Sequence, residues 1–421
     1  MGRADPARPS SESRLLNDQL HIRRNTAILA AVLAIYVAVL SLAAAVLSLT
    51  FVLVTGFRSL LGLGPAIYLA AAALSALPVG RAMDRFGRVP VIAIGFVLGS
   101  LGCAVTAAGT HWDSGAAVIA GFLLIGISGS VTLLIRTAAG DMYPPERRAR
   151  GISLVLFGSV FGAILGPVLF GPLFADKDVA ASTLTVPWLV AGGMSLIACA
   201  VVLTVRPDPK LIGERLSAGQ DQSDPATAAP LSEIVRRPGV LPAMLAAVAS
   251  FGVMVSVMNL TGYVVVDHHH HAQASVFPII GAHVLGMYAL VLVIGRVIDR
   301  VGRGPALGGG LAVMAVSCIG LMWVEGVPMT AVLLFGLGLG WNLSFVSATA
   351  QLADATSPAE RGKLLGLNDL LAGLTGASLA LLGGVALDVL GVTALAIGAT
   401  ILALAPAILL ARVRPVTRSA A

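Results

Sequence analysis

Two residues of opposite charge, Arg136 and Asp369, stand inside long apolar segments of the sequence. A charged side chain in apolar surroundings is costly, so it usually faces a cavity or an oppositely charged partner. Each lies about five to seven residues, or about 7–10 Å at 1.5 Å per residue, from the end of its segment. We therefore predict that they are coupled as a pair. The alternative is that Arg136 reaches water alone while Asp369 caps a neighbouring helix.

A few uncharged or weakly basic polar side chains also occur within apolar segments, and each is a candidate to line a cavity or to bond neighbouring helices. They are Asn368 beside Asp369, His283, Asn342, Asn259, Tyr36, Tyr263 and Tyr288. A cavity with so few charges favours an uncharged or amphiphilic organic substrate. A phosphate or dicarboxylate would need more Arg or Lys.

A run of histidines follows one apolar segment, in Asp267-His268-His269-His270-His271. Such a run can bind Zn²⁺ or Ni²⁺. Because no paired His or Cys cluster accompanies it within the apolar segments, a solvated loop is favoured, and a metal-binding site stays an alternative. The three cysteines, Cys103, Cys199 and Cys318, are far apart and indicate neither a metal site nor a disulfide framework. No cofactor is expected.

The composition places these residues in a membrane protein. Of the 421 residues, 57% are hydrophobic and 11% are charged, whereas a soluble globular chain has about 25% charged residues. Soluble, disordered, coiled-coil and nucleic-acid-binding proteins are thereby excluded. Twelve apolar segments are long enough to cross a bilayer. They are 28–53, 59–80, 90–110, 115–139, 151–174, 186–205, 241–265, 275–295, 305–324, 328–352, 364–387 and 390–411.

The basic residues predict the orientation of these spans. Of 27 Lys and Arg residues, 24 fall on one side, Arg58 and Lys177 fall on the other, and Arg136 lies within a span. Because basic loops stay cytoplasmic, both termini are expected in the cytoplasm, with no cleavable signal before the first span. The expected organisation is a tail (1–26), a six-helix bundle (27–206), a flexible cytoplasmic linker (207–239), a second six-helix bundle (240–412) and a tail (413–421).

An internal repeat relates the two halves. Residues 80–88 read GRAMDRFGR and residues 295–303 read GRVIDRVGR, identical at six of nine positions and 215 residues apart. A second echo pairs Pro144-Pro145-Glu146-Arg147 with Pro358-Ala359-Glu360-Arg361. Two six-helix halves in parallel repeat predict an all-α integral membrane transporter with pseudo-two-fold symmetry. Glycine in each short loop allows a tight turn.

These loops resemble the signature loop of the major facilitator superfamily, and the resemblance covers residues 28–412. It implies a role in gating for Gly80, Asp84, Arg85, Gly87 and Arg88, and for the second copy, Gly295, Asp299, Arg300, Gly302 and Arg303. In the family this aspartate is thought to lock the two halves on the cytoplasmic side. The resemblance implies this role for Asp84, with Arg85 and Arg88 as its partners. It supports the same role less strongly for Asp299. The alternative is positive-inside anchoring alone.

The fifth span carries a glycine stripe that resembles a motif of proton-coupled drug exporters. Its residues are Gly158, Gly162, Gly166, Pro167 and Gly171. Glycines at every fourth position permit close helix packing, and the proline adds a bend. A plain packing seam is the alternative. The arginine that such exporters usually carry early in the fourth span is absent here.

We therefore predict a secondary transporter of the bacterial plasma (inner) membrane, acting as a monomer and not as an enzyme. Its partners are a small-molecule substrate, a coupling proton and membrane lipid, and no nucleic acid. The first hypothesis is proton-coupled export, by antiport, of a small hydrophobic or amphiphilic compound. The alternatives are uptake of a metabolite or vitamin, a non-transporting membrane sensor with the same fold, and metal efflux. The absence of a phosphate-binding Gly-x-x-x-x-Gly-Lys-Ser/Thr loop argues against pumping by ATP.

Overall fold

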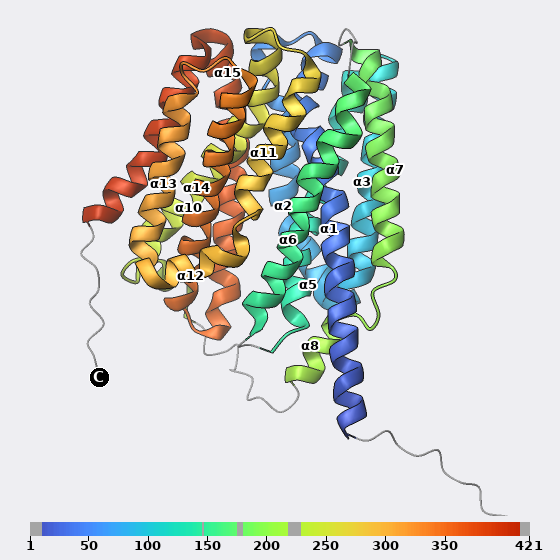
Figure 1. The fold of residues 1–421 in the computed structure, drawn as a ribbon, viewed down its shortest axis with the longest axis vertical. Helices are drawn as coiled ribbons and strands as arrows, with labels where there is room; N and C mark the ends of the chain where they lie inside the picture. Colours follow the sequence, from blue (N-terminus) through green and yellow to red (C-terminus); the bar gives the residue numbers. More distant parts are fainter. Residues whose placement is uncertain (1–10, 145–146, 175–179, 218–228, 413–421) are drawn as a thin grey trace, which may run out of the picture.

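The computed structural model describes residues 11–144, 147–174, 180–217 and 229–412, and these are helical almost throughout (Figure 1). The first half contains α1 (Ser11–Thr55), η1 (Arg58–Leu60), α2 (Leu63–Phe86), α3 (Arg88–His111), α4 (Gly115–Leu133), α5 (Ile135–Asp141), α6 (Arg148–Phe170), η3 (Gly171–Phe174), η4 (Ala181–Leu184) and α7 (Thr185–Val202). Two short helices follow, α8 (Pro209–Ser217) and α9 (Leu231–Arg236). The second half contains α10 (Val240–Tyr263), η6 (Val264–His268), η7 (Gln273–Ser275), α11 (Val276–Tyr288), α12 (Val291–Val301), α13 (Arg303–Gly320), α14 (Val327–Asp354) and α15 (Pro358–Arg412).

The helices account for the twelve predicted spans. Nine helices of the described residues are long and apolar enough to cross a membrane, and the pair α11 and α12, bent by 43°, makes a tenth. One of the nine, Gly362–Pro406, contains two predicted spans, because Gly391 with φ 80° turns α15 back on itself. The one predicted span not yet accounted for, 305–324, corresponds to α13, in which Arg303 and several glycines lower the mean hydropathy.

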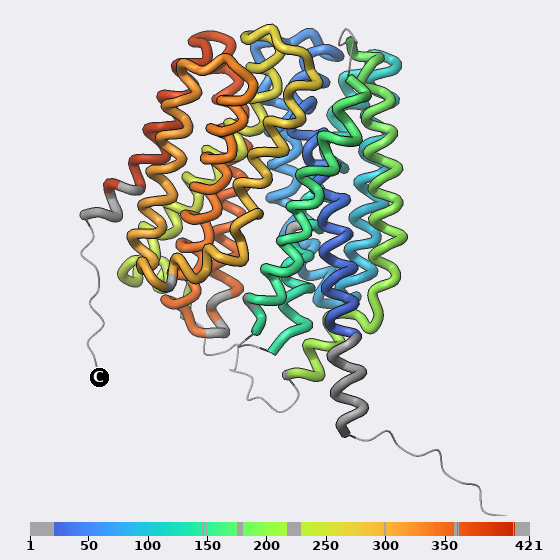
Figure 2. Tube along the Cα trace, in the orientation of Figure 1, coloured from blue at the N-terminus to red at the C-terminus, as the bar shows by residue number. Residues whose placement is uncertain are grey.

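The two halves lie side by side, with blue-to-green helices on one side and yellow-to-red helices on the other (Figures 1 and 2). We call the end of the bundle that carries α8 and α9 the linker end, and the end that carries η1, η4 and η7 the far end. The halves contact each other through α1 with α10, α6 with α11, and α2 with α15. Only α1 and α10 are corresponding helices of the repeat; the other two contacts are equivalent to each other, because α2 corresponds to α11 with α12 and α6 to the first part of α15.

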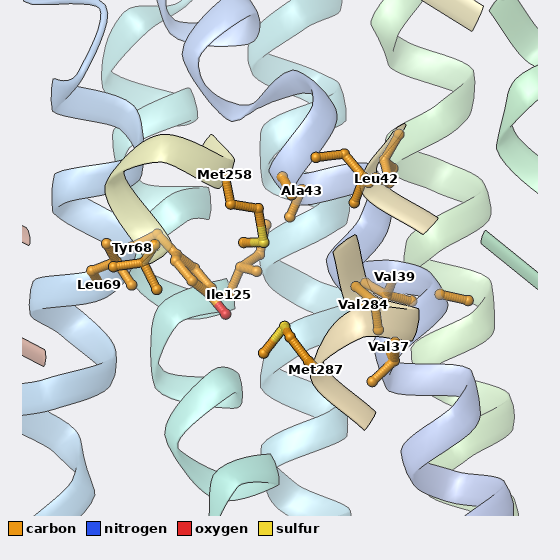
Figure 3. Packing of buried hydrophobic residues seen from close by; sticks show 14 of the residues in the cluster. Val37, Val39, Leu42, Ala43, Tyr68, Leu69, Ile125, Met258, Val284 and Met287 are labelled. Carbon is orange, nitrogen blue, oxygen red and sulfur yellow. The ribbon is translucent and has the colours of Figure 1, made fainter. Parts of the chain in front are cut away.

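One apolar core runs through both halves. Figure 3 shows side chains of α1, α2, α4, α10 and α11 converging, among them Leu42, Ile125, Met258 and Met287. Leu42 is fully buried, and the core continues without a break from one half to the other. Such packing holds the halves together without fixing a single arrangement, since apolar surfaces are not directional.

Two short helices, α8 and α9, form toward the two ends of the segment 207–239, which we expect to be a flexible linker, and its middle, 218–228, lies outside the described residues. Asp208 precedes α8, and its carboxylate accepts hydrogen bonds from the backbone N–H groups of Arg88 and Val89 at 3.1 and 2.9 Å. Arg237 follows α9 and donates to the Glu360 carboxylate at 2.7 and 2.8 Å. Apolar periodicity did not indicate these helices, because polar contacts to the nearest half fix them instead.

Candidate functional site

Arg136 and Asp369 form the one ion pair, among the described residues, that joins the two halves. The Arg136 Nη2 atom lies 2.5 Å from Asp369 Oδ2, and each side chain is 30% exposed. Arg136 is about 12 Å from Pro144 along its helix, and Asp369 is about 16 Å from Pro358, at 1.5 Å per residue. The predicted pairing at similar depth is confirmed; its functional role stays a prediction.

Helix breaks flank this pair. The break between α4 and α5 at Leu134 stands two residues before Arg136. The bend of 43° between α11 and α12 directly follows Tyr288. A break in a membrane helix is tolerated where the broken segment is buried in protein or lines a cavity, and such breaks often mark binding sites. Both breaks therefore lie where an interior site would be expected.

Aromatic side chains line the same level of the bundle. The Trp341 and Phe345 rings of α14 stack with centroids 5.2 Å apart and planes at 20°. Phe251 of α10 lies 6.3 Å from Phe345, and Tyr288 of α11 lies 6.3 Å from Trp341. All four side chains are only partly buried: Phe251, Trp341 and Phe345 lie near the middle of their helices, and Tyr288 ends α11. They pack against the apolar core and keep part of their surface exposed.

Two more tyrosines come from the first half. The hydroxyls of Tyr36 and Tyr68 are 3.1 Å apart, joining α1 to α2. Tyr36 and Tyr288 are near enough to interact electrostatically, and so are Tyr288 and Arg136. Tyr36, Tyr68 and Tyr288 thus form a series of neighbours, of which Tyr288 adjoins Arg136.

The far end is closed by small residues. A Cβ atom on Gly62 would lie 2.0 Å from the Ala380 backbone oxygen, and one on Gly262 would lie 2.5 Å from the Ala45 oxygen. Gly281 is in similar contact with Ala163. The Phe277 ring of α11 also contacts the first half here. Its centroid lies 6.3 Å from the Phe170 ring, on which it stacks, and 5.2 Å from the tilted Phe174 ring. At this end the two halves therefore approach to backbone contact.

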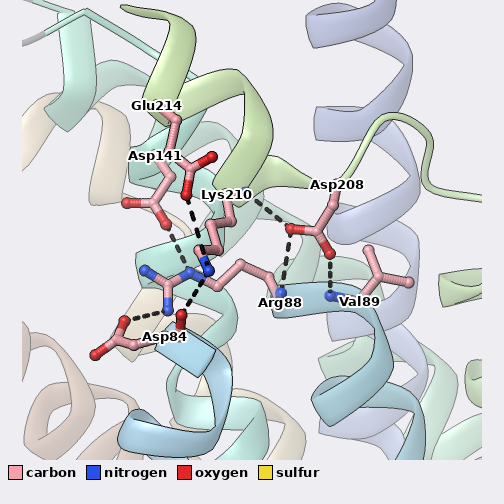
Figure 4. A network of polar contacts seen from close by, with 7 residues as sticks. All are labelled: Asp84, Arg88, Val89, Asp141, Asp208, Lys210 and Glu214. Carbon is pink, nitrogen blue, oxygen red and sulfur yellow. Dashed lines mark hydrogen bonds and ion pairs between the residues drawn. The ribbon is translucent and has the colours of Figure 1, made fainter. Parts of the chain in front are cut away.

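At the linker end, the first signature loop forms a polar network within the first half (Figure 4). Arg88 donates to Asp84 at 2.7 Å and to Asp141 at 2.8 Å. Lys210 of α8 donates to the Asp84 backbone oxygen at 2.6 Å. The Asp84 carboxylate itself is 71% exposed, and its contacts among the described residues lie within the first half. Arg85 lies over the Phe86 ring at 5.2 Å.

The turn itself depends on glycine. Gly87 has φ 98° and Gly302 has φ 92°, a conformation that residues with a side chain rarely adopt. The expectation that these two glycines form the tight turns is confirmed. Gly80 and Gly295 have open space where a Cβ would stand, so packing does not require glycine there.

In the second loop, Arg303 pairs with Asp354 at 2.5 Å, and Arg300 is exposed. This pair repeats the one between Arg88 and Asp141 in the first half. The side chain of Asp299 falls outside the described part of the structure.

The glycine stripe of the fifth span packs within the first half. A Cβ added to any of the α6 glycines at 158, 162 and 166 would collide with α1. The nearest residues of α1 are Ala30, Ala34 and Ser41, respectively. The stripe is thus a seam between α6 and α1, which was the alternative interpretation. Pro167 instead reaches the second half, and Gly171 has open space around its Cβ position.

The remaining polar candidates mostly bond neighbouring helices. His283 Nδ1 is 2.8 Å from the Leu334 oxygen, and the Asn342 amide donates to the Met287 oxygen. Asn259 donates to Val255 within α10. Asn368 is fully buried, and neither polar atom of its side chain has a hydrogen-bond partner among the described residues.

The histidine run ends η6 at the far end. His271 Nε2 is 2.8 Å from the Glu325 oxygen, and the described residues contain no cluster of three or more His, Cys, Asp or Glu that could hold a metal ion. Two apolar hollows also lie in the second half, one bordered by Val257 and His269 and one by Val253 and Leu395. Neither borders Arg136 or Asp369. We place the candidate site at the ion pair because, among the described residues, it is the ion pair between the two halves.

Sequence reasoning missed four acidic residues at the linker end. They are Asp141, Asp208, Asp354 and Glu360. Asp141 and Asp354 stand three and four residues before the repeated Pro-x-Glu-Arg segments, at matching positions in the two halves. That spacing was the available signal, and Glu360 belongs to the segment itself.

A family model described as Major Facilitator Superfamily matches residues 26–282 and 267–421. An uncharacterised MFS-type transporter of Bacillus subtilis, YdeG, is 30% identical over 78% of this chain and 77% of its own. The riboflavin transporter RfnT of Brucella anthropi is 29% identical over 85% and 87%. Among solved structures, a D-xylose–proton symporter has a TM-score of 0.71 at 16% identity, covering 94% of this chain and 98% of its own.

Proposed function

This chain belongs to the major facilitator superfamily and is a multi-pass membrane transporter, not an enzyme, and we propose that it couples movement of a small organic compound to a proton by alternating access. The observation that carries the proposal is the ion pair between Arg136 and Asp369. It is the only ion pair of the described residues that changes if the two halves rock apart.

The pair provides a mechanism for coupling. While the halves are together at this level, Arg136 stabilises the ionised carboxylate of Asp369. When the halves separate, the carboxylate loses that charge in an apolar environment and takes up a proton. Return to the paired state releases the proton. In the state described here the far end is closed and the pair is formed, so the separated state of this cycle requires the halves to move farther apart at the level of the pair.

The gate and the orientation are parts of the same proposal. The linker end faces the cytoplasm, because 24 of the 27 basic residues lie in its loops and tails. Asp84, exposed and free of the second half in this state, would bind that half when the linker end closes. A single chain contains both halves and so is the functional unit, located in the plasma membrane.

We propose export of a hydrophobic or amphiphilic compound as the direction, supported by the sequence of α6 up to Pro167, which resembles that of proton-coupled exporters even though its glycines pack as a seam against α1. Uptake of a metabolite or vitamin is the second candidate. It is favoured by the similarity to RfnT, whose name describes a riboflavin transporter. Both candidates use the same site and the same proton.

Transport in vesicles of known sidedness tests this function. We expect a compound panel to contain a substrate whose movement accelerates when a pH gradient is imposed. Arg136→Gln and Asp369→Asn should each abolish the acceleration, whereas Arg58→Gln, at an exposed far-end position, should not. Acceleration by the gradient in Asp369→Asn equal to that of the unchanged protein would reject Asp369 as the proton site.

A further inference from the structure

The partly exposed rings of Phe251, Trp341 and Phe345, which we call the aromatic platform, lie at the level of the ion pair. We propose that the substrate is a planar aromatic compound with one acidic group, whose ring stacks on this platform and whose acid binds Arg136. This inference rests on the proposed transport function, and it adds the chemical class of the substrate.

The platform has the geometry of a stacking surface. Trp341 and Phe345 stack on one another, with planes at 20° and centroids 5.2 Å apart, so the outer face of the stack is the face on which a further ring can stack. Phe251 meets Phe345 at 42° and bounds that surface from α10. Aromatic rings prefer offset-stacked or edge-to-face partners with centroids 4.5–7 Å apart, which favours a flat ligand over a branched aliphatic one.

Trp341 also carries an unused donor. Its indole Nε1 is buried and has no hydrogen-bond partner among the described residues. A buried N–H without an acceptor is costly, and about nine in ten buried polar groups are paired. An acceptor atom on a bound ring would satisfy it. This orphaned donor indicates a ligand independently of the ring geometry.

Arg136 supplies the second contact. A guanidinium has five N–H donors. In the described structure Arg136 uses one of them in a hydrogen bond to Asp369. Its side chain is 30% exposed, so the remaining donors can reach a ligand. The planar arrangement of these donors matches a carboxylate, which they bind in bidentate fashion.

Tyr288 connects the two contacts. Its ring meets Trp341 edge to face at 6.3 Å, and its hydroxyl lies near enough to Arg136 to interact electrostatically. Tyr288 is therefore a neighbour of both the platform and Arg136. A ligand that spans the two needs an apolar ring at one end and an anionic group at the other.

The charge of the site sets the number of acidic groups. Arg136 is the only basic residue within the twelve predicted spans away from their ends, and it already faces one carboxylate. When Asp369 carries the coupled proton, Arg136 can compensate one anionic group of a ligand, whereas a dianion would leave a second charge uncompensated in apolar surroundings, which is costly. A single acidic group is the charge that this site accommodates.

Equilibrium dialysis of the purified protein in detergent tests the proposal without requiring transport. The labelled probes are naphthoate, its neutral analogue naphthamide, and the non-planar acid decahydronaphthoate. We expect naphthoate to bind at least about tenfold more tightly than either analogue, since a hydrogen bond to a charged group contributes about 1.5–3 kcal/mol. Equal binding of naphthamide would overturn the acidic group, and equal binding of decahydronaphthoate would overturn the platform.

Variants separate the two contacts. Trp341→Ala should weaken naphthoate binding about tenfold, Trp341→Phe should weaken it less, and Trp323→Ala, at a position 74% exposed, should leave it unchanged. Arg136→Gln should remove the preference of the protein for naphthoate over naphthamide. A thermal-stability measurement on each variant identifies any that fails to fold.

Two further results of the binding measurements would overturn part or all of the proposal. Binding of riboflavin more tightly than naphthoate, unaffected by Arg136→Gln, would overturn the acidic class. Failure of all three naphthalene probes to bind would overturn the proposal as a whole. Acceleration of transport by a pH gradient is measured separately, so the proposed function can hold while this inference fails.

Discussion

Arg88 and Asp141 form an ion pair of 2.8 Å at the linker end of the first half, and the second half repeats it between Arg303 and Asp354 at 2.5 Å. The two arginines are 215 residues apart in sequence and the two aspartates 213. The duplication therefore includes the partner as well as the loop. The two pairs differ in burial, since Arg88 is 12% exposed and Arg303 is 37% exposed.

This difference in burial predicts a difference in stability. Arg88→Gln leaves Asp141, which is 24% exposed, without its partner, and we expect a loss of about 2–3 kcal/mol. Arg303→Gln removes a more exposed pair, for which about 0.2–1 kcal/mol is typical. Unfolding of the two variants in detergent compares them. Equal losses, or a larger loss for Arg303→Gln, would contradict the argument.

Gly87→Ala should destabilise the protein more than Gly302→Ala. Both glycines have a positive φ that costs about 1–3 kcal/mol for other residues. A Cβ on Gly87 would additionally meet Asp208 Oδ2 at 3.0 Å, whereas Gly302 has no atom nearer than 3.7 Å. Gly80→Ala is the control, because its Cβ position is open. Equal thermal stability of all three variants would show that the turn can be rebuilt without glycine.

Asp84→Asn should impair transport much more than Asp299→Asn. The Asp84 carboxylate is exposed in the state described here, in which the far end is closed, and it is available to bind the second half when the linker end closes. Neutralising it would weaken that closed state. Initial rates in sided vesicles measure the effect, and equal rates for the two variants would remove the asymmetry between the loops.

Glu360 predicts a pH-dependent contribution to stability. Hydrogen bonds from Arg237 and from the Ser357 and Ala229 backbone N–H groups hold the pKa of its carboxyl well below the ordinary value of about 4.3. A lowered folded-state pKa stabilises the protein above the ordinary value, and the contribution is lost as the pH falls toward the folded-state value. Glu360→Gln should therefore lower the melting temperature at pH 7 and have a shrinking effect below pH ~4. A difference that is constant across this range would indicate packing instead of charge.

Replacing His268–His271 by serine should leave transport of an organic substrate nearly unchanged. The run lies at the far end, and its described contact is the hydrogen bond from the His271 ring to the Glu325 oxygen. Vesicle uptake of the organic substrate and of Zn²⁺ measures both activities. Loss confined to Zn²⁺ would support metal efflux.

The helical architecture and the interior ion pair were predictable from the sequence. Spans follow from apolar length, and Arg136 and Asp369 each stand out because so few charges interrupt those spans. Depth along a helix is linear in residue number, so two charges at similar depth on opposite halves could be matched before the structure was known.

The aromatic platform and the linker helices were not predictable in the same way. Phe251 and Phe345 belong to different helices, and an apolar ring in an apolar segment carries no signal of which neighbour it faces. Asp208 and Glu360 act through backbone and side-chain contacts to loops that are distant in sequence. Such contacts depend on how helices are placed, and hydropathy contains no information about placement.

At the glycine contacts that close the far end, each carbon atom added as a side chain should shift the equilibrium between the closed and the open conformation of that end. Gly62, Gly262 and Gly281 each bring backbone to backbone across the interface, so an added side chain acts as a wedge between the halves without touching the ion pair. Every 1.4 kcal/mol of such strain changes the population ratio tenfold. Graded substitutions at these positions, from alanine to leucine, would give a calibrated series of proteins biased toward opening at the far end, on which inhibitors and antibodies selective for one state could be sorted.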